Sequence, residues 1–590
     1  MFAASDCGVR ITQVRVANFR SLENIEVDLD DLTVLVGANN SGKTSFLEAM
    51  FAAIGAGRRL FGKEDIHLKS GETSVPIERK AVVDIRVQPF NEQIIDLFPL
   101  GSFWIGLWGK NIVQDQYDND FIGIRTELAW NETQSEYRLE RKFLKQWKLT
   151  GDWLTANTTN GISIEQLEPI LLYYMNAQRD IKEDLHTSGS FWQRLVNDLG
   201  LPEESVLEIE QALSTLNARM VEESSVLKHI QKSLMKMNNV VTTEQTEITP
   251  VSRHLRDLAK GMDIQFATSG AQSFPLAKHG MGTRSLASIL VFRAFASWKA
   301  LQASSNQTQI HTLLGLEEPE AHLHPQAQRA LFHQIKEIKG QRILSTHSPY
   351  FAGQAKLEAL RLFQKKGSSS EVSRLDISNL KPDEIKNLKN LVILTRGDIL
   401  FCRALILFEG QTEELALPVY AEAYWGMNIH ELGFNFISVG GSTYYPFVWL
   451  AKYLNIKWYI FSDGEETPKI KLNKSLEKAE GGNASTRDNV FILPNGQSIE
   501  DYLIDQKYLP EIEQAMINIG DLQSNQQNPA SEETIKTKFK IKSNKTRLAI
   551  PVTNAIIATD DLTRRFPQAI AELFEKISTD FGLKKVGGAS

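Results

Sequence analysis

Cysteine is nearly absent from this chain of 590 residues, which contains only Cys7 and Cys402. Two cysteines so far apart in the sequence provide neither a disulfide framework nor the paired spacing of a zinc site. Long apolar runs are missing too, because a membrane-spanning helix needs about 20 mostly apolar residues. The stretch 285–298 is shorter and carries Arg293, and no apolar segment near the N-terminus has the form of a secretory signal. The sequence therefore predicts a cytoplasmic protein that does not enter a membrane.

Charge of one sign is not in large excess, because 65 lysines and arginines face 72 aspartates and glutamates, a formal net charge of −7. This balance neither requires nor excludes a nucleic-acid partner, since binding depends on where basic side chains cluster. The hydrophobic fraction of 42% is ordinary for globular proteins and excludes a mainly disordered chain. Single cores stop growing at roughly 250–300 residues, so several domains are expected.

The first half begins with the pattern of an α/β domain. Residues 10–28 alternate apolar and polar side chains, and residues 32–36 form a short apolar run, as strands do. A helix is predicted to begin between Ser41 and Thr44. From residue 164 to residue 240, apolar side chains recur at three- and four-residue spacing, which favours a helical insertion that packs or forms dimer contacts (164–240).

A second α/β region is predicted after the polar stretch 365–389, and it opens with the apolar strand 404–408. Within it, the hydrophilic segments 465–488 and 521–533 are expected to be exposed loops. The predicted domains are residues 1–390, with the insertion at 164–240, and residues 400–590.

A glycine-rich loop lies between the run 32–36 and the helix after it. Its sequence, Gly-Ala-Asn-Asn-Ser-Gly-Lys-Thr, fits the pattern GxxxxGK[ST] in full. In such loops the backbone N–H groups face phosphate oxygens, the lysine reaches the β- and γ-phosphates, and the threonine holds Mg²⁺. The residues predicted to bind a nucleotide in this way are Gly37, Asn39, Asn40, Gly42, Lys43 and Thr44.

An acidic pair ends a mostly apolar run later in this half. Glu317 and Glu318 follow residues 311–316, and two adjacent carboxylates suit one role in binding Mg²⁺ and another in orienting the attacking water. We assign Glu317 to the metal and Glu318 to the water. Taken alone, two glutamates after an apolar run are more often an ordinary strand end.

Two further elements flank the acidic pair. Upstream, residues 280–285 open a helix with glycines and a hydroxyl, so Gly282 and Ser285 could face a phosphate. Downstream, His347 follows a strand that includes residues 343–344. A single histidine at a strand end is more often structural than catalytic, so its meaning depends on the other elements.

In this order, the glycine loop, the helix at 280–285, the acidic pair and the histidine resemble the ATP-binding cassette (ABC) ATPase head of recombination and repair proteins. The resemblance implies ATP as the nucleotide and a catalytic part for His347. In that family the signature helix completes the site on the opposite protomer, which implies two ATP molecules held between the heads of a homodimer. Two departures stand out: Glu317 occupies the place of the usual aspartate, and residues 280–285 are a loose version of the signature.

Carboxylates recur at strand ends in the second half. Glu409 and Glu413 follow the strand 404–408, and Asp463 and Glu465 follow a second apolar run. A third acidic element contains Glu500. Hard divalent cations take oxygen ligands, and two such ions can clamp both oxygens of a phosphodiester displacement. Each element alone would more often be a solvated strand end, but together they indicate a metal site.

The order of these acidic elements resembles a TOPRIM domain. Glu409 corresponds to the glutamate of the first motif, and Asp463-x-Glu465 stands where DxD is usual. Ser498 occupies a position where relatives can carry an acid. The family also has a late lysine near the metals that stabilises the transition state, and Lys545 is the candidate for that role.

An ABC head followed by a TOPRIM domain resembles the overcoming-lysogenization-defect (OLD) family of nucleases, over most of residues 10–560. The resemblance implies ATP and Mg²⁺, with Mn²⁺ as an alternative, at both sites, and double-stranded DNA as the substrate. It implies a homodimer or a higher homo-oligomer. It also implies a role in bacterial defence against phage, with a helicase as in Gabija-type systems or with retron components as partner.

A basic run lies near the C-terminus. Four of its lysines alternate with other residues between Lys536 and Lys542, a pattern that would place them on one face of an extended segment. Such a face suits a phosphate backbone. The alternative is an edge strand protected by lysines.

The leading hypothesis is an ATP-regulated, Mg²⁺-dependent DNA endonuclease or nickase, in which metal-activated water attacks a phosphodiester. The alternative is a DNA-binding ATPase clamp whose acidic domain is structural. Topoisomerases and primases share TOPRIM chemistry, but no separate domain for a DNA-attacking tyrosine and no zinc-ribbon spacing is evident. Whether ATP promotes cleavage or restrains it stays open, because coupling depends on contacts that differ between two global states.

Overall fold

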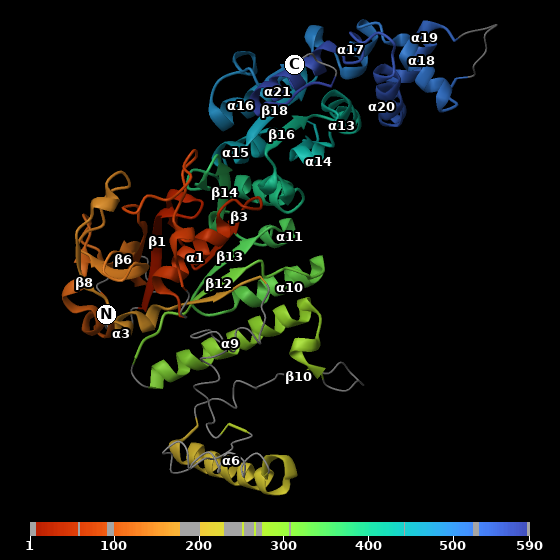
Figure 1. The fold of residues 1–590 in the computed structure, drawn as a ribbon. Coiled ribbons are helices and arrows are strands. Elements are labelled where there is room, and N and C mark those ends of the chain that lie inside the picture. Colours follow the sequence, from red (N-terminus) through yellow and green to blue (C-terminus); the bar gives the residue numbers. More distant parts are fainter. Residues whose placement is uncertain are drawn as a thin grey trace. The chain divides into compact units, whose positions relative to one another are not determined.

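The structure, a computed structural model, has a mixed α/β fold (Figure 1). It contains two compact units, and no helix in its described part is long and apolar enough to cross a membrane. The first unit comprises Met1–Leu35, Asn39–Thr346 and Phe363–Val372, and the second comprises Val36–Ala38, His347–Leu362 and Ser373–Ser590. The residues described are 8–56, 60–90, 100–177, 201–228, 251–252, 265–266, 274–305, 308–441, 443–522 and 530–586.

A seven-stranded antiparallel sheet begins the first unit. Its order is β2-β1-β4-β6-β7-β8, with β5 beside β6. Asn18 and Arg20 have positive φ angles of 55° and 48° at the turn between the first two strands. The strand pattern predicted for residues 10–28 therefore forms two antiparallel strands joined by a tight turn. The strands are β1 (Gly8–Phe19), β2 (Leu22–Asp28), β4 (Ala81–Phe90), β5 (Val113–Gln114), β6 (Asp120–Asn131), β7 (Glu136–Leu144) and β8 (Thr158–Gly161).

A six-stranded sheet carries the predicted nucleotide motifs. Its order is β15-β14-β3-β13-β12-β9, and β12 pairs in parallel with both β13 and β9. Both β3 and the strand before His347 form as predicted. The strands are β3 (Leu32–Val36), β9 (Leu172–Met175), β12 (Leu313–Glu317), β13 (Gln341–Thr346), β14 (Leu360–Lys366) and β15 (Ser369–Arg374).

The prediction of a continuous helical segment from residue 164 was wrong at its start. After the short helix α3 (Ile164–Leu167), the chain enters β9, whose side chains alternate between two packed faces rather than following a helical stripe. A long helix does form at α6 (Glu203–Glu223), where most side chains are exposed. Residues 178–200 and 229–240 of the predicted insertion lie outside the described residues.

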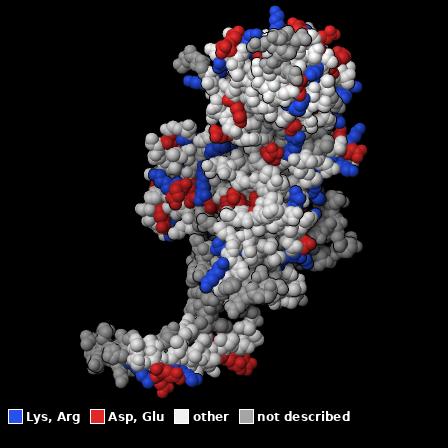
Figure 2. Space-filling view, turned by 90° about the vertical axis from the view of Figure 1, so that its right-hand side faces the viewer, with Lys and Arg blue, Asp and Glu red and all other residues white. Residues whose placement is uncertain are grey.

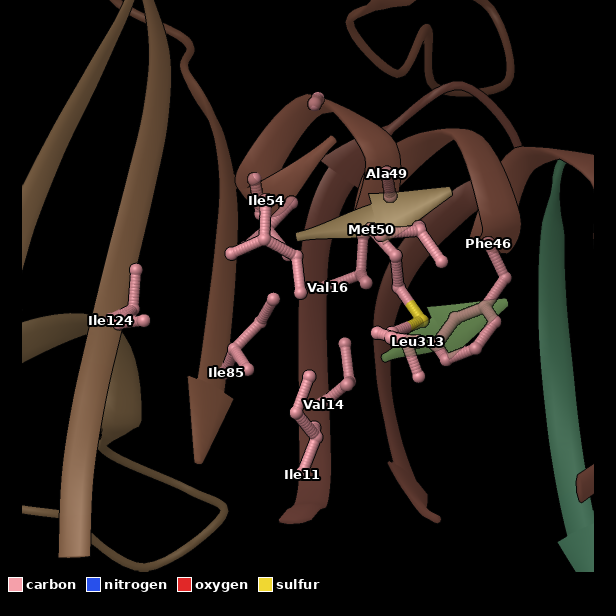
Figure 3. Packing of buried hydrophobic residues seen from close by; sticks show 14 of the residues in the cluster. Ile11, Val14, Val16, Phe46, Ala49, Met50, Ile54, Ile85, Ile124 and Leu313 are labelled. Carbon is pink, nitrogen blue, oxygen red and sulfur yellow. The ribbon is translucent and has the colours of Figure 1, made fainter. Parts of the chain in front are cut away.

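Helix α1 (Lys43–Ile54) forms the core between the two sheets of the first unit. Figure 3 shows Phe46, Met50 and Ile54 of this helix beside side chains of the neighbouring strands. All three are fully buried, and burying such a side chain stabilises a fold by about 1.5–3 kcal/mol. The strand residues labelled around them are Ile11, Val14, Val16, Ile85, Ile124 and Leu313.

The opposite face of the six-stranded sheet is covered by helix α9 (Met281–Ser305). Successive side chains of a strand point to opposite faces, and β9 shows this directly. Tyr174 packs against Phe51 of α1 with ring centroids 5.8 Å apart, whereas Tyr173 packs against Phe292 of α9 at 5.5 Å. Helix α10 (Pro325–Lys336) packs beside α9 (Figure 1). The nucleotide loop and the signature-like helix are thus fixed on two sides of one sheet.

The second unit contains a four-stranded parallel sheet of order β17-β16-β18-β19. The two inner strands follow apolar runs predicted from the sequence, and β16 is completely buried. In a parallel sheet all carboxyl ends meet at one edge, so residues that follow these strands gather there. The strands are β16 (Ala404–Phe408), β17 (Phe434–Ser438), β18 (Lys457–Ser462) and β19 (Val490–Ile492).

Helices surround this sheet and complete the unit. An aromatic cluster, with Tyr424 and Phe574 at 5.4 Å, packs the helix after β16 against the C-terminal helix. The helices are α11 (Pro349–Ala352), α12 (Pro382–Asn387), α13 (Gln411–Trp425), α14 (Ile429–Leu432), α15 (Tyr445–Tyr453), α16 (Glu466–Glu480), α17 (Ile499–Asp505), α18 (Leu509–Asn518), α19 (Glu532–Lys540), α20 (Lys542–Ile557) and α21 (Gln568–Phe581).

Two predictions about polar segments of this unit were wrong. The segment 465–488 is mainly helix α16 rather than a loop, because Leu472 and Leu476 give it a buried face. The basic run is also helical rather than extended: α19 and α20 meet at Ile541, and Ile535 and Phe539 are buried at four-residue spacing. The segment 521–533 runs into α19, and residues 523–529 lie outside the described part.

A buried ion pair lies in the antiparallel sheet. Arg125 of β6 donates two hydrogen bonds to the carboxylate of Asp84 in β4, at 2.8 and 2.7 Å. The same guanidinium donates to backbone oxygens of Trp153 and Leu154. Both side chains are nearly inaccessible to water. The pair therefore fixes residues 153–154 against the inner strands β4 and β6.

We expect Asp84→Asn to destabilise the first unit by about 3–5 kcal/mol, because it leaves a buried guanidinium without its counter-charge. Chemical unfolding of the purified chain measures the change. The matched control is Glu136→Gln, which removes an exposed partner of Arg138 and should leave stability unchanged. Equal effects of the two substitutions would contradict this account.

Candidate functional site

The glycine loop places α1 with its N-terminus open. Asn40 and Gly42 adopt positive φ angles of 60° and 103° immediately before the helix. A Cβ atom on Gly42 would lie 2.6 Å from the Ser370 hydroxyl and 2.9 Å from a methyl group of Leu22. Only glycine fits there without displacement of its neighbours. The loop is thus shaped to leave backbone N–H groups at the start of α1 for a phosphate.

Lys43 is the first residue of α1, and its ammonium lies buried beside acidic side chains. Its Nζ donates to the Ser41 hydroxyl at 3.4 Å. Burial lowers the pKa of Lys43 to about 8, while the negative charges of Glu318, Glu317 and Glu320 oppose that shift. The structure therefore brings the predicted phosphate-binding lysine and both predicted carboxylates together.

Glu317 ends β12 and faces the start of α1. One of its carboxylate oxygens accepts a hydrogen bond from the Thr44 hydroxyl, and the other accepts one from the Tyr174 hydroxyl at 2.7 Å. A hydroxyl and a carboxylate in contact are the ligand pair that holds Mg²⁺ in P-loop enzymes. These two side chains fit a nucleotide-bound magnesium ion, in agreement with the predicted roles of Thr44 and Glu317.

Glu318 occupies a bend directly after β12. Its φ angle is 42°, and its N–H donates to the carbonyl of Ser345 at 3.0 Å, at the end of β13. A few residues later, Glu320 is buried and accepts a hydrogen bond from the Thr346 hydroxyl. His347 follows directly after this threonine and is partly exposed. The bend thus places Glu318 just beyond the strand, and its part in orienting water stays a prediction.

The signature-like segment begins α9 as predicted. A Cβ atom on Gly282 would lie 2.9 Å from the backbone oxygen of His322, so a glycine is needed where the helix meets the loop after Glu318. Ser285 is buried, and its hydroxyl donates to the carbonyl of Pro319 at 3.1 Å. Within one chain, Ser285 thus joins α9 to the acidic loop. Its contact with a phosphate, like that of Gly282, stays a prediction.

Two residues of this site were missed by the sequence reasoning. Tyr174 lay in the segment interpreted as helical, where the only signal was the short aromatic pair of β9. Glu320 lies in the acidic loop, but a third glutamate there carries no signal of its own. Its burial against Thr346, which depends on the fold, distinguishes it from a solvated side chain.

The second candidate site lies at the carboxyl edge of the parallel sheet. Glu409 follows β16, and one of its carboxylate oxygens accepts a hydrogen bond from the Ser462 hydroxyl at 2.7 Å, at the end of β18. Glu413 lies in the first turn of α13 and is buried. The two glutamates, four residues apart, are therefore both at the junction of β16 and α13, as predicted.

Asp463 and Glu465 lie on either side of a tightly packed glycine. A Cβ atom on Gly464 would lie 2.1 Å from the carbonyl of Leu493. Its N–H donates to the carbonyl of Gln497 at 2.9 Å. This close approach fixes the backbone between the two acids, and Glu465 begins α16 as its N-cap.

Glu500 reaches the same edge from α17 and is buried beside a lysine. The Lys545 ammonium donates to one carboxylate oxygen of Glu500 at 2.8 Å, and the Thr412 hydroxyl donates to the other at 3.4 Å. Burial lowers the pKa of Lys545, but the bond to Glu500 and the charges of Asp463 and Glu413 raise it overall. The structure thus brings Lys545 to the predicted metal site.

Ser498 does not reach the metal site with its own side chain. It caps α17 by accepting a hydrogen bond from the N–H of Asp501 at 3.3 Å. Asp501 in turn pairs with Lys540. Glu500 and Asp501 are therefore each held by a lysine of the helical pair α19 and α20.

The carboxylates at this edge raise one another's pKa values. Burial raises the pKa of Glu413 to about 7, and the charges of Glu500 and Glu409 add to it. Burial raises the pKa of Asp463 to about 8, with contributions from Glu413, Glu409, Glu500 and Glu465. Burial raises the pKa of Glu409 as well, while the Ser462 hydroxyl lowers it. These carboxylates therefore feel one another's charge, and a cation among them would relieve the repulsion.

The donors at this edge fit hard divalent cations. All are carboxylate oxygens, and Asp463 Oδ1 is a buried oxygen without a hydrogen-bond partner among the described residues. Within the part of the chain that the structure describes, no three acidic, histidine or cysteine side chains already form a set that could hold an ion. Side-chain rotations toward the centre are therefore needed, and Ser462 and Lys545 compete for two of the carboxylates.

Comparison with known proteins gives two family matches. Residues 10–88 and 110–352 match the family described as AAA ATPase domain. Together these two ranges span more than half of the chain. Residues 400–464 match the family described as overcoming lysogenization defect protein-like, TOPRIM domain. The matches confirm the predicted order of an ATPase domain followed by a TOPRIM domain. They include Lys43, Glu317, Glu409 and Asp463 but end before Glu500 and Lys545.

Three curated proteins are similar over most of their length. The OLD nuclease of Thermus scotoductus is 22% identical over 427 residues, covering 69% of this chain and 72% of its own. The endonuclease GajA of Bacillus cereus is 22% identical over 463 residues, covering 78% and 75%. The Old nuclease of Escherichia phage P2 is 24% identical over 521 residues, covering 81% of each. Each alignment covers more than two thirds of this chain and therefore extends into both halves.

We expect the substitution Glu413→Gln to raise the melting temperature of the metal-free protein. Because folding raises the pKa of this carboxyl from 4.5 to about 7, ionising it costs the folded state free energy, and that cost is complete above about pH 7. At such a pH a neutral amide removes the cost. Mg²⁺ at about 100 times its Kd should stabilise the wild type by about 2.7 kcal/mol. Glu413→Gln should lose most of that gain.

Glu414→Gln is the matched control, because Glu414 is the next residue and pairs with Arg396 at 3.8 Å instead of facing the other carboxylates. Thermal unfolding with and without Mg²⁺, in the absence of ATP, measures both variants. An equal Mg²⁺ response in Glu413→Gln and Glu414→Gln would show that Glu413 is not part of a metal site.

Proposed function

Because this chain belongs to the AAA ATPase domain family and joins that domain to a TOPRIM domain of the OLD-like type, we propose that it is an ATP-regulated, divalent-metal-dependent DNA endonuclease. The observation that carries this proposal is the set of converging carboxylates beside Lys545 at the edge of the parallel sheet. Burial and the neighbouring carboxylates raise the pKa values of Glu413 and Asp463, and a bound cation would offset that cost of ionisation. The named nuclease relatives support the same activity.

The acidic residues of the second unit would hold Mg²⁺ or Mn²⁺. Bound there, the ions would supply a nucleophilic water and neutralise charge on the phosphodiester. The Ser462 hydroxyl orients Glu409 toward this centre, and the rigid backbone at Gly464 separates Asp463 from Glu465. Lys545 places an ammonium where negative charge develops on the transferred phosphate. The ligands we assign are Glu409, Glu413, Asp463, Glu465 and Glu500.

The first unit binds and hydrolyses ATP in this proposal. Lys43 holds the β- and γ-phosphates, while Thr44 and Glu317 hold the magnesium ion. Glu318, turned out of its strand, orients the attacking water, and His347 lies at the end of the adjacent strand. The signature-like helix, with Gly282 and Ser285, would complete the site of a second chain, which makes a homodimer the working assembly.

The biological setting that we propose is defence against phage in the bacterial cytoplasm. The similarity to GajA supports it. A helicase or a retron would be the partner that supplies the trigger. Double-stranded DNA is the substrate that we propose. On the face drawn in Figure 2, lysine and arginine side chains are interspersed with acidic ones, so DNA contact would rest on local groups of basic residues.

The alternative is an ATP-dependent DNA clamp with a non-cleaving acidic domain. It shares the ATP site but assigns no chemistry to the carboxylates of the second unit. Glu500 is paired with Lys545, but the pKa of the buried Glu413 is raised by burial and by the charges of Glu500 and Glu409. A bound metal ion would relieve that cost, which favours the nuclease.

We expect Glu409→Gln to reduce cleavage of supercoiled plasmid by about 10²-fold or more, because one oxygen ligand of the metals loses its charge. DNA binding should persist. The assay is run with Mg²⁺ or Mn²⁺, with and without ATP. Glu466→Gln, one residue beyond Glu465 and exposed, is the control. Undiminished cutting by Glu409→Gln would disprove the assignment, and intact plasmid with ATP-dependent binding by the wild type would favour the clamp.

For the ATP site, Lys43→Ala should abolish ATP binding, whereas Glu318→Gln should keep binding and slow hydrolysis by about 10²-fold or more. Lys110→Ala, an exposed lysine of the same unit, should change neither. Plasmid cleavage across ATP concentrations then gives the sign of regulation. If neither ATP nor Lys43→Ala alters cleavage, both versions of ATP control are wrong.

A further inference from the structure

A polar cleft of about 970 Å³ opens in the first unit at the amino ends of β12 and β13. The nucleotide loop is at the carboxyl ends of these strands, roughly 15–20 Å away at about 3.3 Å per residue. Ligand pockets commonly measure about 300–1,000 Å³, so the cleft has room for a nucleotide-sized molecule. None of the roles assigned above uses it.

Small residues of α9 leave this space open. Ala296, Ala300 and Ala303 line the cleft from the helix, and Trp104 and Phe90 line it from the side of the antiparallel sheet. Trp104 is only 1% exposed, so the half-buried ring of Phe90 provides most of the aromatic surface, which favours a ligand that has a flat apolar part.

Two buried hydrogen-bond donors in the lining have no acceptor. Trp104 Nε1 and Arg342 Nε are both shielded from solvent, and neither has a hydrogen-bond partner among the described residues. Buried donors are almost always satisfied, and one left unsatisfied costs free energy. Because both atoms are closed to solvent, a ligand with acceptor oxygens would satisfy them only after neighbouring side chains move aside. Arg342 already donates through Nη1 to the carbonyls of Ile338 and Gly340.

The lining also contains His311, and its hydrogen bond to Gln341 fixes which ring nitrogen carries the hydrogen. Gln341 accepts from the Ile11 N–H at 2.7 Å and donates to the Ile11 carbonyl at 2.8 Å, which sets the orientation of its amide. Its oxygen also lies 2.8 Å from His311 Nε2. That nitrogen must therefore carry the hydrogen, and Nδ1 keeps its lone pair. Burial lowers the pKa of His311 to about 4, so the imidazole is neutral.

Positive charge exceeds negative charge in the lining. Lys336, Lys339 and Arg342 contribute cations, and Asp31 and Glu337 contribute carboxylates. Both carboxylates have arginine partners outside the lining: Arg293 lies 2.7 Å from Glu337, and Arg10 lies 4.0 Å from Asp31. Asp31 also acts on Arg342, because its negative charge raises the pKa of that guanidinium against the effect of burial. The cations left for a ligand are therefore mainly Lys336 and Lys339, and these favour an anion.

We propose that this cleft binds a nucleoside monophosphate. The phosphate dianion would bind Arg342 and Lys339 and accept from Trp104 Nε1, while the base would lie against the aromatic wall and donate to His311 Nδ1. This site is separate from the glycine loop and needs no β- or γ-phosphate. It does not depend on the nuclease assignment, since every residue involved lies in the first unit.

The test is isothermal titration of the full chain with AMP, GMP, CMP and UMP, and with ribose 5-phosphate and inorganic phosphate. At least one nucleoside monophosphate should bind at one site per chain with Kd below about 1 mM. Wild type and Lys43→Ala should bind it equally, because the glycine loop is not involved. Arg342→Gln combined with Lys339→Gln should weaken binding at least about tenfold.

Ala300→Phe provides a second test that leaves every charge in place, because the larger ring would fill the cleft. It should abolish binding, and Lys110→Gln should have no effect. Thermal unfolding establishes that each variant is folded. The proposal is overturned if no monophosphate binds, if Lys43→Ala removes binding, or if Ala300→Phe binds as well as wild type. Equal affinity for ribose 5-phosphate would overturn the part assigned to the base.

Discussion

Repulsion between buried carboxylates is the constraint on which the second unit depends. Glu413 and Asp463 have pKa values raised to about 7 and about 8 because burial and neighbouring charges both disfavour ionisation. Isolated side chains would turn toward water to escape one another. They are held by the completely buried strand β16, by the aromatic packing of α13 and by the tight backbone contact at Gly464. The fold thus keeps together charges that become favourable only with cations between them.

In the first unit, neighbouring carboxylates lie beside a cation that belongs to the chain itself, the ammonium of Lys43. Lys43 is buried among three glutamates, and its pKa falls to about 8 through burial while their charges oppose the fall. A nucleotide would bring further negative charge, which the ammonium and a magnesium ion at Thr44 and Glu317 would balance. One site therefore contains a built-in counter-charge and awaits an anion, whereas the other has an excess of anions and awaits cations.

How much the sequence predicts depends on the range over which each signal acts. The glycine loop and Glu409 were found because a strand, a turn and a helix are contiguous, so local pattern sets their geometry. Tyr174 and Glu320 were missed because their importance arises from contacts with Glu317 and Thr346, which only the folded sheet creates. The prediction of an extended segment at Lys536–Lys542 was wrong for a related reason, because the contacts that decide its structure are also made only in the folded unit.

A period of two at Lys536–Lys542 fits a strand, but Ile535 and Phe539 bury at helical spacing against the rest of the unit, and burial outweighs the charge pattern. The same helices explain why Lys545 belongs to the site. It already neutralises Glu500, and Lys540 neutralises Asp501. When Glu500 binds a metal cation instead, the Lys545 ammonium loses its partner and is repelled by that cation. A phosphodiester placed there restores the balance. Metal and DNA are therefore expected to bind cooperatively, since each provides the charge that the other leaves unpaired.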